Sequence, residues 1–274
     1  MNRPRPWRTL VPALLSLVAL LALPLPRVQA QQSTRERIEA LEQEIAALQA
    51  RVRELRALLA AEQPLADEES VKPGINDSWK SEDIGPLIGR LETESREIYT
   101  HRGLLATIVG PRPGDVVADV GAGSGFMTHL FSRLVGETGK VLAVDINQKL
   151  LEHIEDGAAE KGLGNVETVL CTEKSVELPA GSVDLVFVCD TYHHFEYPRN
   201  SLRSIHAALR PGGQLVLVEF ERIPGVSREF ILGHVRAGRE VFQAEIEAAG
   251  FELVNEHDLE AFEENYVLRF RRGD

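Results

Sequence analysis

The sequence has little cysteine, fewer basic than acidic residues, and only one long apolar run. Its two cysteines, Cys171 and Cys189, are too few for a disulfide framework and lack the spacing of a zinc site. Lys and Arg total 30 against 42 Asp and Glu, a net charge of −12, which argues against a nucleic-acid-binding surface. A single long apolar run, near the N-terminus, excludes a polytopic membrane protein. Because 43% of the residues are hydrophobic, the chain can still bury a core, so an acidic globular protein remains.

The first 30 residues have the pattern of a secretory leader. Three arginines within the first eight residues precede an apolar stretch from Leu10 to Leu23, and small residues end the segment at Ala30. We therefore predict a signal peptide over residues 1–30 and export, most simply to the periplasm; an uncleaved leader that tethers the chain to the membrane is the alternative. Cleavage would remove four arginines and no acid, which changes the net charge from −12 to −16. Such a surface disfavours nucleic acid and anionic membranes as partners.

A heptad pattern follows the leader. Apolar residues recur at alternating spacings of three and four, at Ile38, Leu41, Ile45, Leu48, Val52, Leu55 and Leu59. β-Branched residues at the first apolar position with Leu at the second favour a parallel dimer. We predict a coiled-coil helix over residues 34–62 that allows homo-oligomers through residues 38–59, and a flexible linker over residues 63–84. The alternative is an amphipathic helix that folds back onto the domain behind it.

Residues 85–274 alternate between short β-branched runs and helix-length segments. Such a rhythm is typical of parallel strands covered on both faces. We predict an α/β, doubly wound, Rossmann-like, seven-stranded and mostly parallel sheet, in which the last two strands form an antiparallel edge pair. Ligands of this architecture bind at the carboxyl ends of the strands. The expected strands are Val116–Val120, Val141–Asp145, Val166–Leu170, Val183–Asp190, Gln214–Phe220, Phe251–Glu256 and Tyr266–Arg272.

A glycine-rich turn follows the first expected strand and leads into a helix from Phe126 to Leu134. Its glycines, Gly121, Gly123 and Gly125, let the backbone approach a ligand closely. The dinucleotide fingerprint requires a glycine where Phe126 stands, so the spacing argues against a nicotinamide-dependent oxidoreductase.

With Asp119 two residues ahead of it, this turn resembles the first motif of class I S-adenosylmethionine-dependent methyltransferases. The segment Leu209–Phe220, which contains Pro211-Gly212-Gly213, is similar to the ubiquinone/menaquinone-biosynthesis branch of that family. The resemblance covers roughly residues 95–250. It implies S-adenosyl-L-methionine as the cofactor, with Asp119 near its positively charged amino group.

A second acid stands at the end of the second expected strand. Asp145 can accept hydrogen bonds from both ribose hydroxyls, and Ile146 can pack on adenine, although a strand-end Asp can also simply cap the next helix. Where the family usually places an Asp that accepts from the adenine amino group, this chain has Lys174, which cannot accept. Thr172 or Glu173 is expected to substitute.

Candidate catalytic residues follow the fourth expected strand. His193 and His194 are adjacent, so only one is expected to face substrate from an extended loop, and Asp190 can hydrogen-bond cofactor or substrate. Both histidines could instead be packing groups. No metal is predicted, because a third ligand such as His234 or Asp190 would have to converge on the pair.

Residues 92–102 are expected to form one helix before the domain, with Arg96 and Tyr99 on a shared face. His234 and Arg236 are expected to begin the helix before the antiparallel pair.

The sequence thus favours methyl transfer to a small-molecule acceptor by an S-adenosylmethionine-dependent methyltransferase. The alternative is an exported coiled-coil interaction protein whose methyltransferase-like domain binds a ligand without turnover.

Overall fold

The computed structural model describes residues 34–45, 47–48, 51, 68–93, 96–257 and 260–273, and the chain divides into two units at residues 52 and 53. In the first unit, residues 34–45 are helical, and the apolar side chains of Ile38, Leu41, Ile45 and Leu48 are exposed. This is consistent with the helix expected there; its self-association stays a prediction, and the leader lies outside the described residues. Among the described helices, none is long and apolar enough to cross a membrane.

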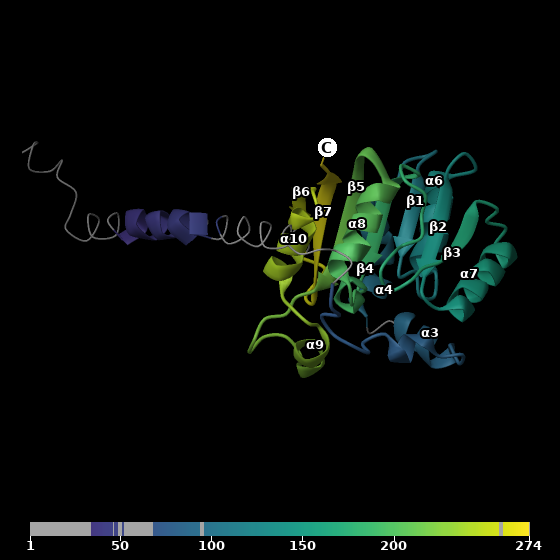
Figure 1. Cartoon of the computed structure of the whole chain (residues 1–274), viewed down its shortest axis with the longest axis horizontal. Coiled ribbons are helices and arrows are strands. Elements are labelled where there is room, and N and C mark those ends of the chain that lie inside the picture. The colour runs from purple at the N-terminus through teal and green to yellow at the C-terminus, as the bar shows by residue number, and fades with distance from the viewer. Residues whose placement is uncertain are drawn as a thin grey trace, which may run out of the picture. The chain divides into compact units, whose positions relative to one another are not determined.

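The second unit is built on one seven-stranded sheet (Figure 1). Its strands are β1 (Val116–Val120), β2 (Lys140–Asp145), β3 (Val166–Leu170), β4 (Val183–Cys189), β5 (Leu209–Phe220), β6 (Phe251–His257) and β7 (Asn265–Arg272). Its helices are α3 (Gly85–Leu91), α4 (Glu97–Thr100), α5 (Arg102–Val109), α6 (Phe126–Val135), α7 (Gln148–Glu160), α8 (Pro198–Ala208), α9 (Glu229–His234) and α10 (Arg239–Ala248). Two short 3-10 helices, η2 (Asp77–Lys80) and η3 (Tyr192–His194), lie in loops.

The strand order is β3-β2-β1-β4-β5-β7-β6. The first five strands are parallel, and β7 runs antiparallel to both of its neighbours, β5 and β6. The chain reverses its direction of travel across the sheet between β1 and β4, the switch point where doubly wound folds bind ligands. The predicted fold class is confirmed, including the antiparallel edge pair. Five of the seven expected strands differ from the observed ones by one to five residues at an end, whereas β1 and β3 match the expectation.

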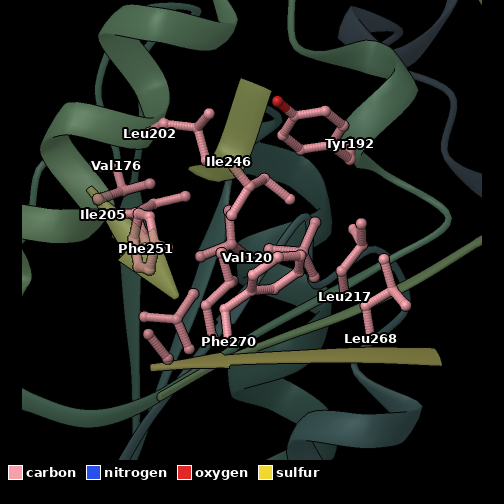
Figure 2. Close-up of a cluster of buried hydrophobic side chains, with 14 of the residues drawn as sticks. Val120, Val176, Tyr192, Leu202, Ile205, Leu217, Ile246, Phe251, Leu268 and Phe270 are labelled. Atoms are coloured by element: carbon pink, nitrogen blue, oxygen red, sulfur yellow. The ribbon is translucent and has the colours of Figure 1, made fainter. Parts of the chain in front are cut away.

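The core lies on both faces of the sheet because successive strand residues point to opposite sides. On one face, Val120, Leu217 and Phe270 pack with Leu202 of α8 and Ile246 of α10 (Figure 2). On the other face, buried residues of the same strands pack with α5 and α6, and α7 covers Ala143 through Leu151 and Ile154. Burial on both faces explains why these strands read as nearly continuous apolar runs in the sequence.

Three local expectations are wrong. Residues 68–84, expected to belong to a flexible linker, pack against the rest of the second unit, with hydrogen bonds that join Ser70 to Glu196, Asn76 to His194 and Trp79 to Asn147. The single helix expected over residues 92–102 is broken at His101 into α4 and α5. His234 ends α9, and Arg236 lies between α9 and α10 instead of beginning a helix.

Candidate functional site

A cavity of about 1020 Å³, including its solvent-open mouth, lies at the carboxyl ends of β1, β2 and β4. The glycine turn after β1 and the loops after β2 and β4 supply much of its wall, because the carboxyl ends of parallel strands meet at one edge of the sheet. The cavity therefore coincides with the switch point.

The glycine turn forms a close-fitting part of the cavity wall. Gly121 and Gly123 have φ of +73° and +58°, in the left-handed region that favours glycine. A Cβ on Gly121 would collide with the side chain of Thr191, and one on Gly123 would lie 2.8 Å from Leu91 Cδ1. Gly125 does not line the cavity; it caps α6, where a Cβ would meet Ile154.

Two buried carboxylates face the cavity. Asp119 accepts a 2.6 Å hydrogen bond from Thr128 Oγ1, and its exposure is only 3%. Burial, with a contribution from the nearby charge of Asp145, raises the pKa of Asp119 to about 7. Burial also raises the pKa of Asp145, although backbone amides that donate to its carboxylate oppose the rise. Two acids held in a mainly apolar cavity favour a ligand that carries positive charge and hydroxyl donors.

Asp145 also organises the loops around it. Its Oδ2 accepts from the Gly123 amide at 2.9 Å, and its Oδ1 accepts from the Asn147 amide at 2.9 Å. The side chain of Asn147, not Asp145, caps α7 by accepting from the amides of Lys149 and Leu150. Each Asp145 oxygen retains a further lone pair that can accept from a ligand hydroxyl.

The segment before α3 supplies a wall that the sequence analysis missed. Asn76 and Trp79 line the cavity. Asn147 Nδ2 donates to the carbonyl oxygens of Trp79 and Ser81 at 2.6 and 2.9 Å, and Asn76 Nδ2 donates to the His194 carbonyl at 3.0 Å. Trp79 is a large aromatic residue in a stretch rich in polar residues, and this was the sequence signal that the segment packs against the domain.

Arg96 and Asp190 form a partly buried ion pair at the cavity wall. Arg96 Nη2 lies 2.6 Å from Asp190 Oδ2, and Asn265 Nδ2 donates to Asp190 Oδ1 at 2.6 Å. Asp190 lines the cavity and has φ of +48°, a conformation that non-glycine residues rarely adopt. Asp190 therefore holds Arg96 and Asn265 in place at the cavity wall.

The loop after β3 presents Thr172 and Glu173 to the cavity. Glu173 is ion-paired with Lys80, so it also ties the segment before α3 to this loop. Lys174 does not line the cavity, and its ammonium lies 4.3 Å from the centre of the Tyr197 ring. Thr172 and Glu173 therefore line the cavity where Lys174 does not, and their contact with adenine stays a prediction.

The two adjacent histidines have different surroundings, although they lie in η3 rather than in an extended loop. His194 lines the cavity, and Trp79 contacts its ring edge-on with centroids 5.6 Å apart. His193 does not line it; its Nδ1 lies 2.9 Å from both carboxylate oxygens of the buried Glu219. Burial and the neighbouring histidines lower the pKa of His194 to about 2, so it is a neutral imidazole at neutral pH.

The two cysteines also line the cavity, and burial favours their thiol form there. Burial raises the pKa of Cys171 to about 12 and that of Cys189 well above its usual range. Since the thiolate is the nucleophilic form, neither is suited to covalent catalysis.

The structure thus brings nearly all sequence-predicted site residues to one cavity. Gly125 and His193 do not line the cavity; Gly125 begins α6, and His193 is bonded to Glu219. The residues that line it are Asp119, Gly121, Gly123, Asp145, Ile146, Thr172, Glu173, Asp190 and His194.

The fold and the position of this cavity define a class: the Rossmann-like methyltransferase fold. Residues 118–217 match the family model described as "Methyltransferase domain". Among solved structures, a SAM-dependent methyltransferase from Aquifex aeolicus superposes with a TM-score of 0.61 at 24% identity, covering 70% of this chain and 99% of that one.

More particular likeness comes from curated relatives. The ubiquinone/menaquinone biosynthesis C-methyltransferase UbiE of Hydrogenovibrio crunogenus is 33% identical over 115 residues, which are 42% of this chain and 45% of that protein. UbiE of Escherichia fergusonii is 35% identical over 114 residues, 41% of this chain and 45% of that protein. The chain therefore matches less than half the length of these relatives.

Proposed function

We propose that this protein is an S-adenosylmethionine-dependent methyltransferase that acts on a small-molecule acceptor. The observation that carries the proposal is the pair of buried carboxylates, Asp119 and Asp145, beside a glycine turn with no room for a Cβ. The matched methyltransferase-domain segment contains both acids and the turn.

The residues present fit this cofactor. Asp119 would hold the ammonium group of its methionine part, which also offsets the unfavourable burial of the carboxylate. Asp145 would accept from the ribose hydroxyls, and Ile146 would pack on adenine. Arg96, held in place by Asp190, has further N–H donors for the methionine carboxylate.

When bound, S-adenosylmethionine supplies an electrophilic methyl group on a sulfonium centre. The protein's task is then to align an acceptor with that group and to exclude water, and such positioning contributes on the order of 7–11 kcal/mol. His194 faces the cavity as a neutral imidazole and would form a hydrogen bond with the acceptor. His193, bonded to Glu219, would hold η3 and with it His194 in place.

Calorimetric titration with S-adenosylhomocysteine and with NADH tests the proposal. We expect saturable binding of S-adenosylhomocysteine, no binding of NADH, and at least about tenfold weaker binding in Asp145→Ala, since charge-assisted hydrogen bonds contribute about 1.5–3 kcal/mol each. Asp156→Ala, an exposed acid on α7, is the matched control. If folded Asp145→Ala binds S-adenosylhomocysteine as tightly as wild type does, Asp145 does not contact this ligand. Binding without turnover of any acceptor would favour the non-catalytic alternative.

We also propose that the protein is exported to the periplasm. This rests on the basic, apolar and small-residue pattern of residues 1–30. A fusion of residues 1–40 to leaderless alkaline phosphatase should be active, since that reporter folds only outside the cytoplasm; an inactive fusion would contradict export.

A further inference from the structure

A cluster of three histidines lies beside the cavity. The proposed function uses His194 and its support His193, and it leaves the convergence of all three rings unexplained. His193 and His194 come from η3, and His234 comes from the end of α9. One ring nitrogen from each lies within 4.8 Å of the other two, and the ring centroids are 4.3 to 5.1 Å apart. The third ligand that the sequence analysis required for a metal site has therefore converged, and it is His234 rather than Asp190.

From this geometry we infer that His193, His194 and His234 form a binding site for a single divalent transition-metal ion of the zinc class. Imidazole nitrogens suit zinc, copper and nickel, whereas calcium and magnesium prefer oxygen ligands. Three protein ligands leave a fourth position for water or a substrate atom, the arrangement typical of catalytic rather than structural zinc.

The spacing of two of the nitrogens agrees with shared coordination. His194 Nε2 and His234 Nε2 are 3.3 Å apart. Two nitrogens bound at about 2.0–2.1 Å to a tetrahedral ion are about 3.4 Å apart, so these rings need little movement to share one ion. The same distance also permits a hydrogen bond between two neutral imidazoles, which is the competing explanation.

His193 has the second-layer partner that metal-binding histidines commonly have. Its Nδ1 lies 2.9 Å from the carboxylate oxygens of Glu219, which leaves Nε2 as the ligand atom. Glu219 is fully buried and also accepts from the His193 amide at 3.1 Å. A carboxylate fixes the tautomer and raises the basicity of a ligand histidine, and a cation beyond the ring offsets a buried negative charge.

The surroundings of the cluster combine two aromatic rings with one ammonium group. Phe230 stacks on His234 at 5.0 Å and Trp79 contacts His194, which forms an apolar shell. The nearby ammonium of Lys72 donates to the carbonyl oxygens of Gly233 and His234. His234 is only partly buried, so an ion can reach it without unfolding the domain.

Metal titration tests the inference without any methyl-transfer assay. The full chain is prepared without a histidine tag, stripped with a chelator, and titrated with Zn²⁺ against a chromogenic competitor. We expect one Zn²⁺ per chain, and Co²⁺ should give the strong visible absorption of a four-coordinate site. His234→Ala should weaken Zn²⁺ binding by about 100-fold or more, and Glu219→Gln by about 10–100-fold.

His153→Ala is the matched control, since His153 lies on α7 outside the cluster. Circular dichroism checks that each variant is folded, and His234→Gln replaces His234→Ala if the latter is not. Equal Zn²⁺ affinity in wild type, the folded His234 variant and His153→Ala would overturn the inference. Loss of Co²⁺ absorption in the His234 variant alone would support it, whereas its absence in wild type would leave only the hydrogen-bonded histidine pair.

Discussion

We predict that Asp119 makes the ligand-free protein less stable at pH 8, where its ionised carboxylate would bind the proposed S-adenosylmethionine. Its carboxyl is buried, and its pKa is raised from 3.8 to about 7 by burial first and by the charge of Asp145 second. A raised pKa means that this group stabilises the fold fully below pH 4 and that the contribution is lost as the pH rises through 7. At pH 8 the ionised carboxylate therefore destabilises the empty protein by up to roughly 4 kcal/mol.

Asp119→Asn removes this charge while keeping an oxygen that accepts from Thr128. The empty variant should be more stable than wild type at pH 8, and the difference should nearly vanish at pH 4. Because each kcal/mol corresponds to about 2–4 °C in a domain of this size, the upper bound is an increase of roughly 8–16 °C in Tm. The same variant should lose S-adenosylmethionine binding, and wild-type affinity should fall as the pH drops below 7.

Thermal unfolding by circular dichroism at pH 4, 6 and 8, with calorimetric titration at pH 6 and 8, measures both effects. Asp156→Asn, an exposed acid on α7, should change neither Tm nor affinity. A variant that is less stable than wild type at pH 8 would refute the reasoning. So would an equal stability difference at pH 4 and 8, because Asp119 would then carry no unfavourable buried charge.

Two further predictions concern the parts of the chain before the sheet. Sedimentation should show self-association for residues 31–274 and a monomer for a chain that begins at Glu68, because the heptad residues are exposed on the described helix; monomers in both would favour the fold-back helix. Trp79→Ala should weaken S-adenosylhomocysteine binding about tenfold by removing apolar cavity wall, while Phe230→Ala, an exposed aromatic on α9, should not. Equal affinities for these two variants in a calorimetric titration would show that the segment before α3 is a passive cover.

Several parts of the fold and site follow from the sequence because their causes are local. The β-branched residues of β1 and β3, the turn chemistry of Gly121 and Gly123, and the amphipathic pattern of α6 each depend on neighbouring residues. Order along the chain then places Asp119 and Asp145 at the ends of adjacent parallel strands, so their meeting at one cavity was predictable. The packing of residues 68–84 was not, since proline, glycine and polar residues also describe a free linker.

Contacts between distant residues were decided by the tertiary structure alone. Arg96 meets Asp190 across 94 positions, and His234 meets His194 across 40, distances at which sequence spacing carries no information about separation in space. The pKa of Asp119 likewise depends on burial, and burial is a property of the whole packed domain. The sequence alone determined that the glycine turn, Asp119 and Asp145 meet at the carboxyl ends of neighbouring parallel strands, because residue type and order along the chain fix them. Which groups are paired, neutral or free to meet a ligand was decided by tertiary packing, because it sets their distances and their access to water.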